Sequence, residues 1–125
     1  MSHAYWVVGA MFGGTDDQLP KFLRGGYWIC GKPTDTEKEQ LSQFKPDDRI
    51  AVKRMLGTAS RNIEIRALGI LMSKAKIEPD SAFGRVEVHW VLDRLKREVP
   101  SKGCFATIHG PFDPDKDWTK TVFQL

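Results

Sequence analysis

The chain of 125 residues has the length of one domain. A hydrophobic content of 41% is enough for a packed core that needs no disulfide bonds or structural metal ions. The 19 basic and 16 acidic residues leave a net charge of +3, which permits contact with nucleic acid without requiring it. The cysteines and histidines show no CxxC or HxxxH spacing, and no apolar run approaches the ~18 residues of a membrane span. We therefore expect one cytoplasmic, monomeric domain over residues 1–125, with buried free thiols, no metal, no cofactor and no membrane partner.

The first quarter of the chain predicts a strand, a glycine loop, a helix and a second strand. The strand covers residues 5–10, and the loop 11–14 ends in two glycines that let a ligand approach the backbone closely. A T-x-x-Q capping box predicts a helix over 15–24, which the double glycine at 25–26 ends. Two aromatic residues open the second strand, residues 27–30.

The remainder of the chain is richer in strands. A T-E-K-E capping box at 36–39 predicts a short helix, and Gly69 is expected to mark a β-bulge. A polar loop ends near Phe83 and Gly84. Four further strands are expected at 49–54, 63–72, 85–92 and 118–123. About six short strands with two short helices indicate an α+β domain built on a curved or closed sheet.

Aromatic and acidic side chains gather around the first loop. Phe12, Trp28, Asp16 and Asp17 all flank backbone that glycine leaves open. Such a set suits a flat ring with polar edges, for example a nucleobase. No Ser/His/Asp or Cys/His constellation is visible, so no catalytic residue is assigned.

Four segments resemble the EVE branch of the PUA-like superfamily, especially the N-terminal DNA-reading domains of McrBC-type restriction systems. They are YWVVGA at 5–10, GGTDDQ at 13–18, FLRGGYW at 22–28 and KPDDRIAVK at 45–53. The segment DSAFGRVEVHWVLDRLKREVP at 80–100 is similar to the related YTH readers. The likeness covers the chain to about residue 109. One departure is the turn Pro46-Asp47-Asp48, where the superfamily often carries Pro-Gly-Asp.

The resemblance implies a PUA-like β-barrel with flanking helices and a pocket for a flipped-out modified base. The residues at the matching positions are Trp28 and Phe83 for an aromatic cage, Asp16 or Asp17 for the base edge, and Met11 and Phe12 for backbone contacts. Trp28 also fits an ordinary core tryptophan, and Asp17 an ordinary helix-start acid, so both readings stay open. Trp6 and Trp90 are expected in the core.

We therefore expect a non-catalytic module that binds a modified, methylated nucleobase in nucleic acid. The likeness to DNA-reading domains favours DNA over RNA, although no residue pattern separates them. The basic residues that flank the pocket in sequence, and that we expect at phosphates, are Lys53, Arg54, Arg61, Lys74 and Arg85.

Two other functions remain open. The first is an ASCH-type hydrolase acting on a modified nucleoside, for which Lys53 with Glu64 is the one pair that resembles an activated group. The second is a plain protein-interaction domain.

Overall fold

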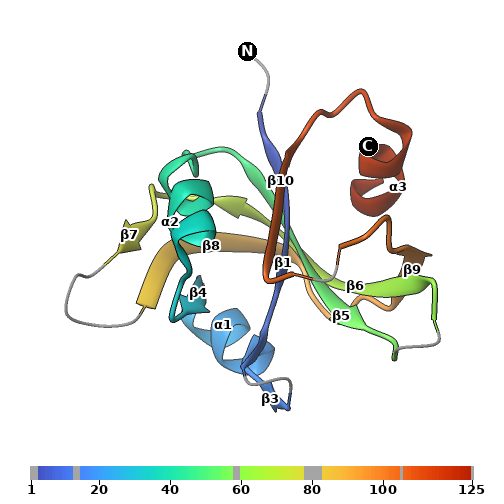
Figure 1. Ribbon diagram of the computed structural model, residues 1–125, viewed down its shortest axis with the longest axis horizontal. Helices are drawn as coiled ribbons and strands as arrows, with labels where there is room; N and C mark the ends of the chain where they lie inside the picture. The colour runs from blue at the N-terminus through green and yellow to red at the C-terminus, as the bar shows by residue number, and fades with distance from the viewer. Residues whose placement is uncertain (1–2, 13–14, 58–59, 78–82, 105, 125) are drawn as a thin grey trace.

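The computed structural model describes residues 3–12, 15–57, 60–77, 83–104 and 106–124. Most of these residues form one strongly curled sheet with the strand order β10-β1-β5-β6-β8-β4 (Figure 1). The strands of this path are β1 (Tyr5–Gly9), β4 (Tyr27–Gly31), β5 (Arg49–Met55), β6 (Asn62–Leu71), β8 (Phe83–Leu92) and β10 (Ile108–Phe112). The expected glycine pair at 13–14 and most of the loop before Phe83 lie outside the described residues.

Shorter elements complete the fold. Strand β7 (Lys76–Ile77) pairs with β8, β9 (Arg97–Pro100) pairs with β6, and β2 (Met11–Phe12) pairs with β3 (Asp16–Asp17). The helices are α1 (Leu19–Gly25), α2 (Asp35–Ser42) and α3 (Asp117–Phe123). They pack against β4, β10 and β9 respectively (Figure 1). The result is an α+β fold with a half-barrel sheet. Among the pairings described, the edge strands β10 and β4 do not meet, so the sheet curls without closing.

One parallel pair sits within an otherwise antiparallel sheet. Strands β1 and β5 run side by side in the same direction, with Tyr5 opposite Arg49 and Gly9 opposite Lys53. Their carboxyl ends therefore lie at the same edge of the half-barrel. In open α/β sheets, that edge is where ligands commonly bind.

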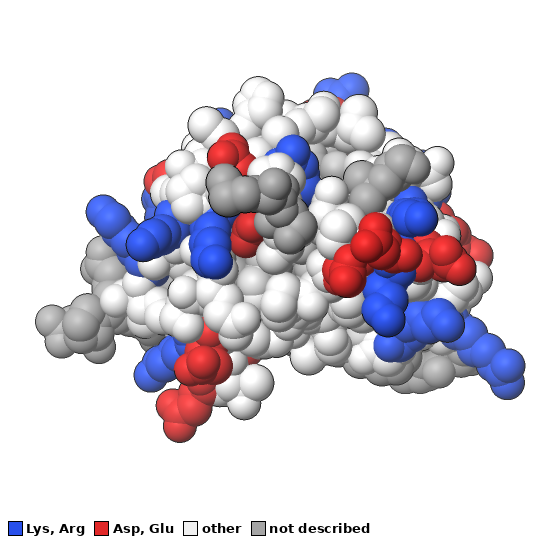
Figure 2. All heavy atoms as spheres, turned by 90° about the horizontal axis from the view of Figure 1, so that it is seen from above, with Lys and Arg blue, Asp and Glu red and all other residues white. Residues whose placement is uncertain are grey.

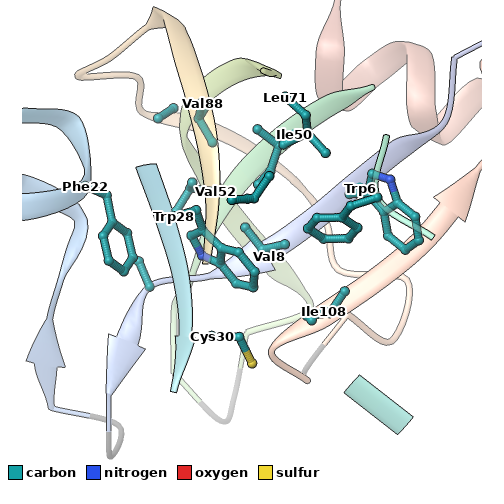
Figure 3. Packing of buried hydrophobic residues seen from close by; sticks show 14 of the residues in the cluster. Trp6, Val8, Phe22, Trp28, Cys30, Ile50, Val52, Leu71, Val88 and Ile108 are labelled. Carbon is teal, nitrogen blue, oxygen red and sulfur yellow. The ribbon is translucent and has the colours of Figure 1, made fainter. Parts of the chain in front are cut away.

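The curled sheet has a hydrophobic core on each face. The larger core contains Trp6, Val8, Phe22 and Trp28 and is shown in Figure 3. The smaller core contains Tyr5, Val7 and other residues that α3 covers. The side chains of consecutive residues of β1 pack into opposite cores, because side chains alternate along a strand. Strand β1 is therefore buried on both faces over Tyr5–Val8.

Five expected strands are present, close to their expected bounds, as β1, β4, β5, β6 and β8. The expected irregularity at Gly69 is also present, since the pairing of β6 with β8 shifts between Leu68 and Gly69. The alternation of β8 buries Val86 and Val88 and exposes Glu87.

The starts of two helices differ from the sequence prediction. Helix α1 begins at Leu19 rather than residue 15, because residues 16–17 pair as β3 and Asp17 accepts a hydrogen bond from the Leu19 amide. Pro20 lies in the first turn, where it is tolerated. The capping box of α2 uses Thr34 and Glu37, two residues earlier than expected. Thr34 Oγ1 accepts from the Glu37 amide at 3.2 Å, and Glu37 Oε1 accepts from the Thr34 amide at 2.9 Å.

The expected final strand at 118–123 is wrong, because this segment is helix α3. Thr119, Val122 and Phe123 are buried together, and a spacing of three to four residues places them on one face of a helix. A strand would send Val122 and Phe123 to opposite faces. Strands β7, β9 and β10 were not predicted, since each is short and lacks an alternating pattern.

Candidate functional site

A cavity of about 700 Å³ opens where the carboxyl ends of β1 and β5 meet. Its lining comes from five separate segments: residues 9–12, 31–32, 53–55, 83 and 106–107. Three of these segments are the ends of β1, β4 and β5, and Phe83 is the first residue of β8. A cavity of this volume is within the range of small-ligand sites in proteins. Five of the residues proposed from the sequence meet here: Met11, Phe12, Lys53, Arg54 and Phe83.

The walls of this cavity are large apolar side chains that remain accessible. Met11 is 37% exposed, Met55 40% and Phe83 47%. These are three of the six large hydrophobic residues that are exposed in the described part of the chain. Exposed apolar groups that gather in a hollow are typical of a binding surface. The walls therefore present a place for a flat apolar ring.

Phe12 holds the inner side of the cavity in place. Its ring is half-buried and packs 6.3 Å from the Phe22 ring, measured between centroids. A Cβ atom built on Gly31 would lie 3.4 Å from Cζ of Phe12. A Cβ at that distance would make an ordinary van der Waals contact, so strand β4 passes beside the ring at Gly31. This contact orients the ring of Phe12 where it lines the cavity.

Lys53 is the unusual residue of the cavity. Its side chain is only 5% exposed, and its Nζ lies within 3.8 Å of the place that a Gly9 Cβ would occupy. Among the described residues, its single hydrogen-bond contact is the Met55 thioether sulfur at 4.0 Å, and no carboxylate forms an ion pair with it. Burial lowers the pKa of Lys53, because the ammonium loses hydration.

The loop 106–107 forms the opposite rim. The Thr107 carbonyl accepts a hydrogen bond from the Gly9 amide at 2.8 Å, which ties the loop to the end of β1. His109 Nε2 accepts from the Ala106 amide at 2.9 Å. Burial lowers the pKa of His109, and the nearby charge of Lys53 lowers it further. A neutral imidazole is the form that can accept this hydrogen bond.

The two cysteines do not supply a nucleophile. Both are buried and free, as predicted. Burial raises the pKa of Cys30 to about 12 and that of Cys104 to about 11, although Lys53 acts in the opposite direction on Cys104. Because the thiolate is the reactive form, these thiols are inert near neutral pH.

Trp28 does not line the cavity, which corrects its proposed role as a cage residue. Its side chain is fully buried, and Figure 3 shows it in the larger core between β4 and β1. The indole N–H donates to the Gly9 carbonyl at 2.9 Å. Neither face of the ring is therefore available for stacking on a ligand. The core reading that the sequence left open for Trp28 is the correct one.

The two acidic residues proposed for the base edge also lie elsewhere. Asp17 forms an ion pair with Arg66, at 2.9 Å between Oδ2 and Nη1, and its other oxygen accepts from the Leu19 amide at 3.1 Å. Both oxygens of the carboxylate are thus engaged at the start of α1. Asp16 is exposed on β3, and neither residue borders the cavity.

The proposed phosphate contacts separate into two groups. Arg54 is exposed at the cavity, whereas Lys53 is buried in its wall and cannot serve as a surface contact. Arg61, Lys74 and Arg85 do not border the cavity. The Arg85 guanidinium stacks 4.3 Å from the Tyr27 ring centre and pairs with Glu87 at 3.0 Å.

The sequence reasoning missed Lys32 and the loop 106–107. Lys32 is exposed and follows the last residue of β4, so it sits at the cavity beside Gly31. Its position two residues after the predicted strand 27–30 could have indicated a basic residue near the expected pocket. The rim at 106–107 had no comparable signal, because hydrogen bonds to β1 and His109 place it there.

The pair proposed for a hydrolase is not assembled. Strand register puts Lys53 opposite Ile65 and Arg54 opposite Glu64. Neighbouring residues of a strand point to opposite faces, so Lys53 and Glu64 are on different sides of the sheet. Glu64 instead borders a smaller cavity of about 390 Å³ with Arg54 and Arg66. The Lys53–Glu64 pairing is therefore wrong.

The charge on the surface is mixed rather than concentrated. On the face shown in Figure 2, Lys and Arg side chains are interspersed with Asp and Glu. Among the described residues, no cluster of His, Cys, Asp and Glu is suited to hold a metal ion. The described helices include none that is long and apolar enough to cross a membrane.

The fold is similar to that of several solved proteins. Protein PSPTO5229 from Pseudomonas syringae has a TM-score of 0.60 at 12% identity, over 98% of this chain and 100% of that protein. Rpa0253 from Rhodopseudomonas palustris has a TM-score of 0.60 at 16% identity, over 98% and 94%. A hypothetical protein from Leishmania major has a TM-score of 0.51 at 8% identity, over 79% and 69%. At these identities the likeness shows a shared fold alone. No family model and no curated protein matches the sequence.

Proposed function

We propose that this chain is an EVE-type, PUA-like module that binds a modified nucleobase flipped out of a nucleic acid. The observation that carries the proposal is the cavity of about 700 Å³ at the carboxyl ends of β1 and β5, with Phe12 and Phe83 in its walls. Stacking on aromatic side chains stabilises an extruded base by about 1–3 kcal/mol. The methionines at positions 11 and 55 add apolar surface for a methyl group.

Each segment of the lining has a role in this proposal. Phe83 is 47% exposed and offers a face for stacking, while Phe12 lies beside Gly31 of β4 and forms part of the wall. Arg54 and Lys32 are exposed beside the opening and suit phosphates on either side of the flipped nucleotide. The interspersed charges of Figure 2 favour a local contact of this kind over a broad basic face.

The test of this proposal is binding to oligonucleotides that differ at one base. Fluorescence anisotropy would compare otherwise identical strands that carry 5-methylcytosine, N6-methyladenine or no modification, as DNA and as RNA. We expect tighter binding to a modified strand than to the unmodified one. Equal affinity for every strand would contradict the proposal.

Phe83→Ala tests the assigned wall, with Leu92→Ala as its matched control. Both residues are exposed and lie at opposite ends of β8, at 47% and 43% exposure. We expect Phe83→Ala to reduce the preference for the modified base about tenfold, the effect of losing one stacking face. Leu92→Ala should keep the full preference. A preference that survives in both variants would exclude Phe83 from the site.

Arg54→Gln separates phosphate binding from base recognition. Because a phosphate contact carries no sequence information, this change should weaken binding to modified and unmodified strands by the same factor. Arg61→Gln is the control, since Arg61 is exposed but does not border the cavity. Loss of base preference in Arg54→Gln would instead place Arg54 at the base.

The hydrolase alternative retains one supporting observation, the buried Lys53 with its lowered pKa. A neutral amine is the nucleophilic form of lysine. Incubation of the protein with modified nucleosides, followed by chromatography, would show turnover if this alternative holds. Binding of a modified base without turnover would support the non-catalytic binding module.

A further inference from the structure

Lys53 is a buried cation without an anionic partner among the described residues. It is 5% exposed, its Nζ is beside Gly9, and its hydrogen-bond contact there is the Met55 sulfur at 4.0 Å. A thioether is a weak acceptor and does not replace water around an ammonium. Burial of an unpaired charge costs several kcal/mol, so such a group gains strongly from an anion that reaches it.

The rest of the cavity reinforces this charge. The described lining contains the cations Lys32, Lys53 and Arg54 and no acidic residue. Among the described residues, the acidic side chains nearest in sequence are Asp35 on α2 and Asp16 on β3, and neither borders the cavity. The described lining therefore combines aromatic walls with three positive charges, of which that of Lys53 is buried.

We propose that the cavity binds a nucleobase that carries a carboxylate, with Lys53 as the residue that receives this group. The inference rests on the proposed function and narrows its ligand from modified bases in general to carboxylated ones. A flat ring would lie between Phe12 and Phe83, and its carboxylate would accept a charge-assisted hydrogen bond from the Lys53 ammonium. A methyl group at the same position leaves the ammonium without a partner.

A backbone phosphate is the competing anion, and the geometry separates it from Lys53. Arg54 and Lys32 are exposed at the opening, where the strand would pass. Lys53 is buried in the wall and is reached by a group that enters the cavity. A carboxylate on the inserted base satisfies that condition.

The experiment compares one DNA sequence with a central cytosine, 5-methylcytosine or 5-carboxylcytosine, using the wild type, Lys53→Met and Lys120→Met. Methionine nearly preserves the length and volume of the lysine stem and removes the charge. Lys120 is exposed on α3 and serves as the matched control for loss of one positive charge. Thermal unfolding of each variant would establish that it is folded before binding is measured.

We expect the wild type to prefer the carboxylated over the methylated strand by about tenfold or more, the effect of one charge-assisted hydrogen bond. Lys53→Met should bring this ratio close to one, and Lys120→Met should keep it. The free nucleosides 5-carboxyldeoxycytidine and 5-methyldeoxycytidine, used as competitors, should show the same order because the selectivity lies in the cavity.

Four results would overturn the inference. If the methylated strand binds as tightly as the carboxylated one but tighter than the unmodified one, the carboxylate assignment fails and the proposed function stands. If no strand is distinguished, the inference fails, and the proposed function then depends on the comparison with N6-methyladenine and with RNA. If Lys53→Met lowers the affinity for all strands by the same factor, Lys53 contacts a phosphate and its assignment to the carboxylate fails. The assignment also fails if Lys53→Met keeps both the affinity and the preference for the carboxylated strand, since Lys53 then makes no contact with the ligand.

Discussion

Two buried charged residues lie at or near the ends of strand β5, and their surroundings differ. Asp48 is 3% exposed and precedes the strand, while Lys53 is 5% exposed and lies near its end. Asp48 accepts hydrogen bonds from the Trp6 indole at 3.1 Å and from the amides of Ala4 at 3.1 Å and Lys45 at 3.2 Å. Among the described residues, the only hydrogen-bond contact of Lys53 is the thioether of Met55. The charge of Asp48 is used within the fold, whereas that of Lys53 is available to a ligand.

The aromatic residues repeat this contrast. Trp28 is fully buried and its N–H is bonded to Gly9, whereas Phe83 is 47% exposed and borders the cavity. A side chain whose polar and apolar surfaces are all covered stabilises the fold. One that keeps an open face or a free charge beside a cavity is suited to binding. The predictions below test this division between Asp48 and Trp28 on one side and Lys53 and Phe83 on the other.

Trp28→Ala should have the largest effect on stability. The change leaves a cavity in the larger core and removes the hydrogen bond to Gly9, so it should lower the free energy of unfolding by about 3–5 kcal/mol. Phe83→Ala should lower it by less than about 1 kcal/mol, since the ring is half exposed. Urea denaturation measures both. A similar loss of unfolding free energy in the two variants would contradict the assignment of Trp28 to the core and of Phe83 to the binding surface.

Asp48→Ala should have the second-largest effect and lower the free energy of unfolding by about 3 kcal/mol. It leaves three N–H donors without their acceptor, and each unsatisfied buried donor costs about 1–3 kcal/mol, partly recovered through water. Asp16→Ala, at an exposed position on β3, is the control and should change stability by less than about 0.5 kcal/mol. An Asp48 variant as stable as this control would remove the structural role assigned to the carboxylate.

Lys53→Met should act in the opposite direction and stabilise the unliganded protein by about 1 kcal/mol at neutral pH, because it removes a buried charge that has no anionic partner among the described residues. The pH dependence checks the cause. The pKa of Lys53 is lowered in the fold from 10.5, so the unfolded chain binds more protons between the lowered value and 10.5. Wild-type stability should therefore recover relative to Lys53→Met as pH rises through that window.

The cysteines also titrate in that range, with the opposite sign. The unfolded thiols ionise near 9.0, whereas the pKa of Cys104 is about 11 and that of Cys30 about 12 in the fold, so stability falls as pH rises above 9.0. Both cysteines are present in the two proteins, so the difference between wild type and Lys53→Met isolates the lysine, apart from its coupling to Cys104 and His109. A difference that does not vary with pH would show that the lysine is not buried as an unpaired charge.

Asp47→Gly is the smallest predicted change. Asp47 has a φ of 76°, in the left-handed region that glycine adopts without strain. The substitution removes this strain from the turn and should stabilise the protein by about 0.5 kcal/mol. Differential scanning calorimetry would detect the rise in Tm. A decrease would show that the side chain of Asp47 stabilises the turn.

The sequence predicted those parts of the fold that local patterns determine. The alternation at 85–92 predicted β8, and the run of β-branched residues around Val7 predicted β1. The site was predicted in part: Met11, Phe12 and Phe83 do meet at one cavity. Trp28 could not be assigned to core or cavity from the sequence, because a tryptophan at a strand start fits both and tertiary packing decides.

The burial of Lys53 could not be predicted from the sequence either. Its neighbours in the chain give no sign that it is buried, since that depends on the approach of Gly9 from β1 and on the position of Cys104. Helix α3 was missed because a segment of seven residues carries a weak periodic signal. For Lys53 the deciding contacts join residues far apart in the chain.

Mapping of the bound nucleic acid by NMR tests the central claim most directly, because a protein of 14.2 kDa gives well-resolved amide spectra. The modified strand that binds most tightly would be titrated into labelled protein. The account predicts that the largest amide shifts fall on residues 9–12, 31–32, 53–55 and 106–107 around the cavity. Shifts that concentrate instead on Trp6, Asp48, Phe112 and Asp113, which line a separate cavity of about 560 Å³, would contradict it.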